Sequence, residues 1–133
     1  MLKVVVLRDY QSMSEHSAGL VARRIREKPA AVLGLASGST PLGLYRELVK
    51  MTVRGRLDLS RVVTFNLDEY YPIEQDNPQS YHHFMRQNLW EPAGISPQRA
   101  HIPAGKPADI AASCRDYELK IGRAGGIDLQ ILG

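Results

Sequence analysis

The chain has 133 residues, of which 44% are hydrophobic and 23% are charged, and it carries a net charge of +3 at pH 7. This length and composition are those of one ordinary globular domain, with no room for a second. The basic residues are scattered apart from a cluster at 23–28, and no basic–aromatic stripe accompanies them, so we do not expect nucleic-acid binding.

The cysteine content and the hydropathy limit the cellular setting. The only cysteine, Cys114, excludes both a disulfide within the chain and a cysteine-based metal site. It falls on the apolar stripe of an expected helix, so we expect a packed thiol. No apolar run reaches the ~18 residues that a membrane helix needs, and the N-terminus has no signal-peptide pattern. We therefore expect a cytoplasmic protein without a membrane segment.

The first third of the chain alternates between strand and helix patterns. Apolar, β-branched residues predict a strand at 4–7. Ser12 and Glu15 fit a capping box, which predicts a helix from Ser12 that ends before Pro29. A second buried strand is expected at 31–35.

A short polar turn comes after this second strand. It contains Ser37, Gly38, Ser39 and Thr40, and Pro41 suits the first position of a helix with Thr40 as its N-cap. A helix N-terminus directs free N–H groups and a positive dipole end at one point, so we favour a phosphate site here over a plain tight turn. The spacing fits neither a dinucleotide-binding loop nor a Walker loop.

A third buried strand, at 62–65, runs directly into Asn66, Asp68 and Glu69. In open α/β sheets, ligands bind beyond the carboxyl ends of the strands. A carboxylate in that place, Asp68 above all, is a candidate general base. The alternative is an aspartate that only starts a turn or caps the next element of the chain.

The remaining elements are a polar loop at 72–78, a helix capped by Ser80, a short strand at 101–102, a helix capped by Asp109 and a strand at 127–132. Strands that alternate with helices predict an α/β fold: an open parallel sheet with helices on both faces. The two polar strand ends should then meet at one edge of the sheet. Such an edge would suit a phosphorylated sugar, with its phosphate anchored remotely and a carbon placed near the base.

The four histidines do not suggest a metal site. His16, His82, His83 and His101 lack metal-ligand spacing, and the two adjacent ones point about 100° apart on a helix. We expect structural or surface roles for them, and no metal or other cofactor.

Three segments, 33–41, 63–70 and 79–85, resemble the glucosamine-6-phosphate deaminase family, which shares a Rossmann-like superfamily with ribose-5-phosphate isomerase. The pair Phe-Asn-Leu-Asp-Glu-Tyr and Ser-Tyr-x-x-Phe-Met is specific. The Ser-Gly-Ser-Thr-Pro turn is weaker, because 6-phosphogluconolactonases look similar there. Lactonases usually carry Asp-Glu-Arg at 68–70, where this chain has Asp-Glu-Tyr, which favours the deaminases.

The resemblance implies a reaction and a set of residues. Asp68 would move a proton from C2 to C1 of the opened sugar, ammonia would leave and fructose 6-phosphate would form, without metal or cofactor. The partner would be a phosphorylated aminosugar. The implied substrate-binding residues are Ser37, Gly38, Ser39, Thr40, Glu69 and Tyr81.

The resemblance also implies that the chain is truncated. Family members continue into an Asn/Asp-Gly-His-Ile motif with the ring-opening residues, and further on into a basic phosphate partner, whereas this chain ends at Gly133. We expect residues 1–133 to be the N-terminal part of a single sugar-phosphate deaminase/isomerase domain, inactive or nearly so alone. Its uncovered edges predict a homo-oligomer. A lactonase-like hydrolase and a non-catalytic sugar-phosphate sensor stay open as alternatives.

Overall fold

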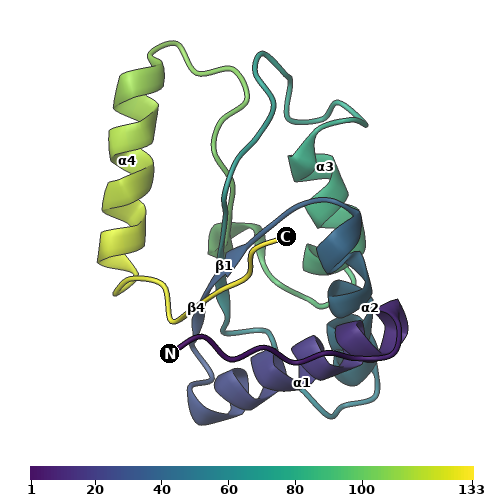
Figure 1. Ribbon diagram of the computed structural model, residues 1–133. Helices are drawn as coiled ribbons and strands as arrows, with labels where there is room; N and C mark the ends of the chain where they lie inside the picture. The colour runs from purple at the N-terminus through teal and green to yellow at the C-terminus, as the bar shows by residue number, and fades with distance from the viewer.

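Four parallel strands form the centre of the computed structural model, which describes residues 1–133 (Figure 1). They lie in the order β3–β2–β1–β4, with the bounds β1 Val32–Leu35, β2 Val63–Asn66, β3 Ala100–His101 and β4 Leu129–Gln130. All three pairings are parallel. The open parallel sheet expected from the sequence is therefore confirmed.

Helices lie on both faces of the sheet, also as expected. They are α1 Tyr10–Glu27, α2 Ser39–Val53, α3 Tyr81–Met85 and α4 Ile110–Arg123, with the short helices η1 Arg86–Trp90 and η2 Pro97–Arg99 between them. Figure 1 shows α4 on the opposite side of the strands from α2 and α3. From β1 the chain adds β2 and then β3 on one side of β1, and it then returns to place β4 on the other side of β1. Because crossovers are right-handed, this reversal carries α4 to the other face.

The hydrophobic core lies between the sheet and the packed pair α1 and α2. Helix α1 buries Ala18, Val21, Ala22 and Ile25, which recur at the helical spacing that predicted this stripe. Strand β1 is buried along its whole length, as expected for an inner strand covered on both faces. The core therefore fixes both β1 and α2, and with them the turn that joins the two elements.

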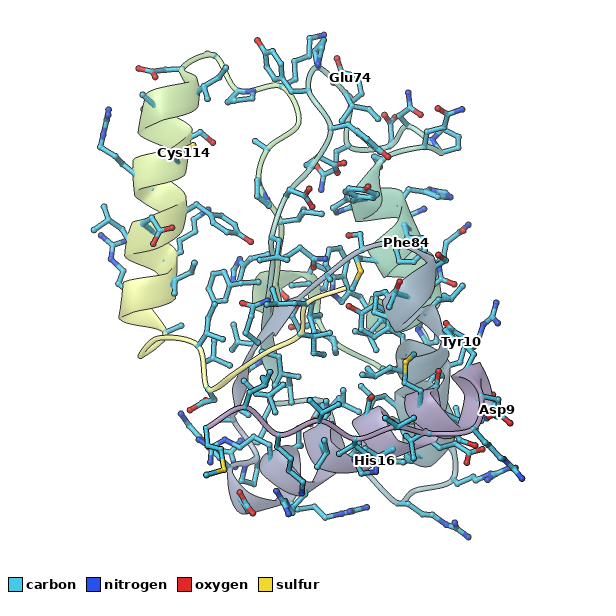
Figure 2. All side chains as sticks on the ribbon, in the orientation of Figure 1. Asp9, Tyr10, His16, Glu74, Phe84 and Cys114 are labelled. Carbon is cyan, nitrogen blue, oxygen red and sulfur yellow. The ribbon has the colours of Figure 1, made fainter.

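Helix α4 is held to its face of the sheet through Tyr117 and has no buried residue. The Tyr117 hydroxyl donates to the backbone oxygen of Asn66 at 2.7 Å, and its ring meets Phe65 edge-on at 5.7 Å. Figure 2 shows Cys114 on the side of α4 turned toward the strands, but the residue is exposed. The prediction of a packed thiol is wrong, because Cys114 borders a cavity between α4, the segment after β2 and the loop before α4.

The N-terminal segment differs from the expectation in two respects. Residues 4–7 form no strand and are exposed, because no neighbouring strand pairs with their backbone groups. Helix α1 begins at Tyr10 instead of at Ser12. The cause is Asp9, whose Oδ1 accepts a hydrogen bond from the N–H of Ser12 at 2.7 Å and so caps the helix earlier.

The later elements lie close to their expected places. Ser80 and Asp109 cap α3 and α4 as predicted, each accepting a backbone N–H at 2.9 Å. Strand β4 covers only Leu129–Gln130 of the expected 127–132, although the N–H groups of the flanking Asp128 and Ile131 also donate to β1. No helix is both long and apolar enough to cross a membrane.

Candidate active site

The β1–α2 turn, residues 37–40, leads from the sheet into the N-terminus of α2. Its Gly38 has φ 107° and ψ −174°, a conformation open almost only to glycine, and serves as the N-cap. The helix therefore begins at Ser39, and the prediction of Thr40 as the N-cap is wrong. No side chain caps α2, so its first N–H groups and the exposed residues Ser39 and Thr40 are open to a ligand at the positive end of the helix.

The β1–α2 turn is fixed from the core side and bordered by β4. The buried Tyr45 hydroxyl donates to the backbone oxygen of Ala36, and burial raises the pKa of Tyr45. The chain after β4 lies against α2, since a Cβ on Gly133 would be 3.4 Å from the Cδ of Pro41. The strand order reverses between β1 and β4, which is where ligands bind in open α/β sheets.

The segment after β2 leaves the sheet beside the β1–α2 turn. Leu35 pairs with Asn66 across the two strands, and the N–H of Leu67 donates to the Leu35 oxygen at 3.1 Å. The Nδ2 of Asn66 donates to the Oγ of Ser37 at 3.3 Å. Asp68 lies two residues after Asn66. The expectation that the two polar strand ends meet at one edge of the sheet is therefore confirmed.

Asp68 lines a cavity of about 490 Å³ between the segment after β2, the loop before α4 and α4 itself. Glu69 and Tyr117 line the same cavity. None of the residues of the β1–α2 turn lines it, and Thr40 borders a separate cavity of about 100 Å³ together with Ile131. The structure thus brings Asp68 and Glu69 into one cavity and places the turn at the same sheet edge, outside that cavity.

Glu69 connects the end of β2 to the start of α3. Its Oε1 accepts the backbone N–H groups of Tyr70 at 2.9 Å and Tyr81 at 2.8 Å, and its Oε2 accepts that of His82 at 2.9 Å. Both carboxylate oxygens are thus bonded within the protein, and they hold the segment that carries Asp68. A direct contact of Glu69 with substrate stays a prediction, but its structural role here is to position this segment.

Tyr81, the first residue of α3, contacts Tyr70, which follows Asp68 and Glu69 in the chain. The two hydroxyls lie 3.1 Å apart and the ring centroids 4.5 Å apart. The hydrogen bond with Tyr70, followed by burial and the charges of Asp68 and Glu69, raises the pKa of Tyr81 to about 12. Tyr81 therefore keeps its proton at neutral pH. Sequence reasoning missed Tyr70, although it comes directly after Asp68 and Glu69 in the motif.

The four histidines come from three places in the fold: His16 from α1, the adjacent His82 and His83 from α3, and His101 from β3. No three side chains among His, Cys, Asp and Glu gather where they could hold a metal ion. His82 and His101 are half-buried, and burial lowers the pKa of both. Both imidazoles are therefore predominantly neutral at neutral pH, in keeping with packed, structural side chains.

Comparison with known proteins gives consistent matches over almost the whole chain. Residues 9–133 match the model of the family described as glucosamine-6-phosphate isomerases/6-phosphogluconolactonase. A relative named glucosamine-6-phosphate deaminase, from Halothermothrix orenii, is 52% identical over 132 residues, which are 99% of this chain and 55% of the relative. The chain thus spans about half the length of the relatives that it matches.

Solved structures agree with this match. A monomeric glucosamine-6-phosphate deaminase superposes with a TM-score of 0.93 at 39% identity, over 97% of this chain and 54% of that one. A 6-phosphogluconolactonase from Thermotoga maritima gives a TM-score of 0.78 at 24% identity, over 97% of this chain and 58% of its own, which shows the fold alone. The chain therefore belongs to the family of glucosamine-6-phosphate isomerases and 6-phosphogluconolactonases.

Proposed function

We propose that the complete protein containing this chain converts glucosamine 6-phosphate to fructose 6-phosphate and ammonia, and that residues 1–133 form the N-terminal part of its single domain. The observation that carries the proposal is the parallel register of β1 and β2, which brings the uncapped start of α2 and the segment of Asp68 to one edge of the sheet. The deaminase named above, 52% identical, supports this choice within the family.

In the proposed mechanism the β1–α2 turn binds the sugar phosphate. The N–H groups at the start of α2 and the hydroxyls of Ser37, Ser39 and Thr40 are suitable donors, and Gly38 lets the phosphate approach the backbone. Binding energy gained at this remote group orients C1 and C2 of the opened sugar at the catalytic base.

Asp68 is the proposed base. Its carboxylate takes the proton from C2 and returns it to C1, while a second proton passes from the C2 amine to O1, so that the C1 aldehyde becomes a hydroxyl and C2 becomes an imine. Water then adds at C2, and the C2–N bond breaks, which releases ammonia and leaves the C2 ketone. Tyr81, which stays protonated, is the proposed donor that helps close the site, and Glu69 keeps the Asp68 segment against α3. The proposed reaction uses no metal or other cofactor.

The test is ammonia release by the complete protein. We expect turnover of glucosamine 6-phosphate to fructose 6-phosphate, and little or none by residues 1–133 alone. Hydrolysis of 6-phosphogluconolactone without ammonia release would contradict the proposal in favour of the lactonases. Thermal stabilisation by sugar phosphates without turnover of any would instead identify a sensor.

We also propose that the protein is cytoplasmic and that residues 1–133 self-associate. Strands β3 and β4 lie at the two edges of the sheet, where one side of each has no strand partner, and Ile110 and Leu119 of α4 are 52% and 55% exposed. Light scattering should give a dimer or larger species for the 133-residue chain. A monomer at all concentrations would contradict this prediction, and the complete protein serves as the comparison, because one solved relative is a monomeric enzyme.

A further inference from the structure

Tyr10, the first residue of α1, reaches across to the first turn of α2 (Figure 2). Its hydroxyl donates to the backbone oxygen of Ser39 at 2.6 Å and accepts the N–H of Gly43 at 2.8 Å. The backbone oxygen of Thr40 lies 3.2 Å from the same hydroxyl. The hydroxyl therefore lies between the carbonyl and N–H groups that pair along the first turn of an α-helix.

The two helices touch closely at this point. A Cβ on Gly43 would lie 2.1 Å from the Oγ of Ser14 and 2.9 Å from the Cε1 of Tyr10, so only glycine lets α1 approach α2 this far. Ser14 is 1% exposed and Tyr10 is 47% exposed, so the contact is buried at Ser14 and open to solvent at Tyr10. The Tyr10 ring is thus held in place from both helices.

We infer that Tyr10 is a positioning residue for the phosphate-binding turn, an inference that rests on the proposed function. The peptide bond between Ser39 and Thr40 is planar and trans, so its carbonyl and its N–H point in opposite directions. When Tyr10 holds the Ser39 oxygen on the α1 side, the N–H of Thr40 is directed to the opposite side, toward the open N-terminus of α2.

This arrangement predicts which kinetic constant changes when the Tyr10 hydroxyl is removed. Its hydroxyl already donates to Ser39 and accepts from Gly43, so it acts through the backbone of the turn and not on the substrate. Because the phosphate is remote from C1 and C2, we expect the turn to bind it equally before and during the chemical step. Loss of the hydroxyl should therefore raise KM and leave kcat nearly unchanged.

The experiment is Tyr10→Phe in the complete protein, which keeps the ring and removes the hydroxyl. We expect KM for glucosamine 6-phosphate to rise about 3- to 10-fold, as for one lost hydrogen bond, with kcat within about twofold. The dissociation constant for inorganic phosphate should rise by the same factor.

The matched control is Thr52→Val, which removes a hydroxyl hydrogen bond of 3.0 Å to the Leu48 oxygen at the far end of α2. It should lower thermal stability at most and leave phosphate affinity unchanged. Unchanged phosphate affinity in Tyr10→Phe, an equal loss in Thr52→Val, or no phosphate binding by the unaltered protein would overturn the inference. Failure of the unaltered protein to release ammonia while Tyr10→Phe still weakens phosphate binding would overturn only the proposed function.

Discussion

Asp68→Asn in the complete protein should lower kcat for ammonia release by about 10²- to 10⁴-fold, the usual contribution of a general base. The amide has nearly the shape of the carboxylate but cannot take the C2 proton. KM should change little, because the phosphate is anchored at the β1–α2 turn and not at Asp68. Steady-state kinetics on glucosamine 6-phosphate measure both quantities.

Asp76→Asn is the matched control for this substitution, because Asp76 is an exposed aspartate in the loop at 72–78. It should have the kinetics of the unaltered protein. Turnover by Asp68→Asn close to that of the control would remove Asp68 as the base. A rise in KM with unchanged kcat would instead make Asp68 a binding residue.

The second large effect is on stability and concerns Asp128, at the end of the sheet away from the candidate site. Its carboxylate accepts hydrogen bonds from the Nζ of Lys28 at 2.8 Å, the N–H of Val32 at 2.8 Å and the Nη2 of Arg24 at 3.0 Å. The side chain is 13% exposed. Asp128→Asn would leave Lys28 without its anion and Arg24 with only Glu27, at 3.7 Å, and should lower the free energy of unfolding by about 2 kcal/mol.

This contribution depends on pH in a defined direction. The hydrogen bond from Lys28, followed by that from Val32, lowers the pKa of Asp128 to about 2. Because the folded-state pKa lies below the unfolded value of about 3.9, the stabilisation is present above about pH 4 and is lost as pH falls toward 2. Urea unfolding should therefore show a difference between Asp128→Asn and the unaltered chain at neutral pH that shrinks in acid.

Asp116→Asn, on the exposed side of α4, is the control and should unfold like the unaltered chain at every pH. A difference between Asp128→Asn and the unaltered chain that persists unchanged at acid pH would contradict the assignment, because protonation would then not affect the interaction. Equal stability of Asp128→Asn and the unaltered chain at neutral pH would also contradict it, because water would then replace the carboxylate at Lys28 and Arg24 without loss.

The elements predicted correctly are those whose signals are local. Ser80 and Asp109 each accept an N–H three residues on, so a short window of sequence contains the whole interaction. Strands β1 and β2 lie within one residue of their predicted places, because buried strands have short apolar sequences. The prediction of a strand at 4–7 was wrong, since a strand depends on a partner elsewhere in the chain.

In the candidate site too, features with local signals were predictable and contacts between distant residues were not. The meeting of the β1–α2 turn with the segment of Asp68 was predictable from the rule for parallel strands and is visible in the register of β1 and β2. The bonds of Glu69 to the start of α3 span 12 and 13 residues across a polar loop, and that of Tyr10 to Ser39 spans 29. No periodicity or capping pattern encodes such contacts.

The most direct test of a shared site is an NMR titration of the isotope-labelled complete protein with fructose 6-phosphate. If one ligand spans the β1–α2 turn and Asp68, the amide signals of residues 38–40 and 67–69 should shift together with one dissociation constant. Shifts confined to 38–40, or two different dissociation constants, would contradict a common sugar-phosphate site at this edge of the sheet.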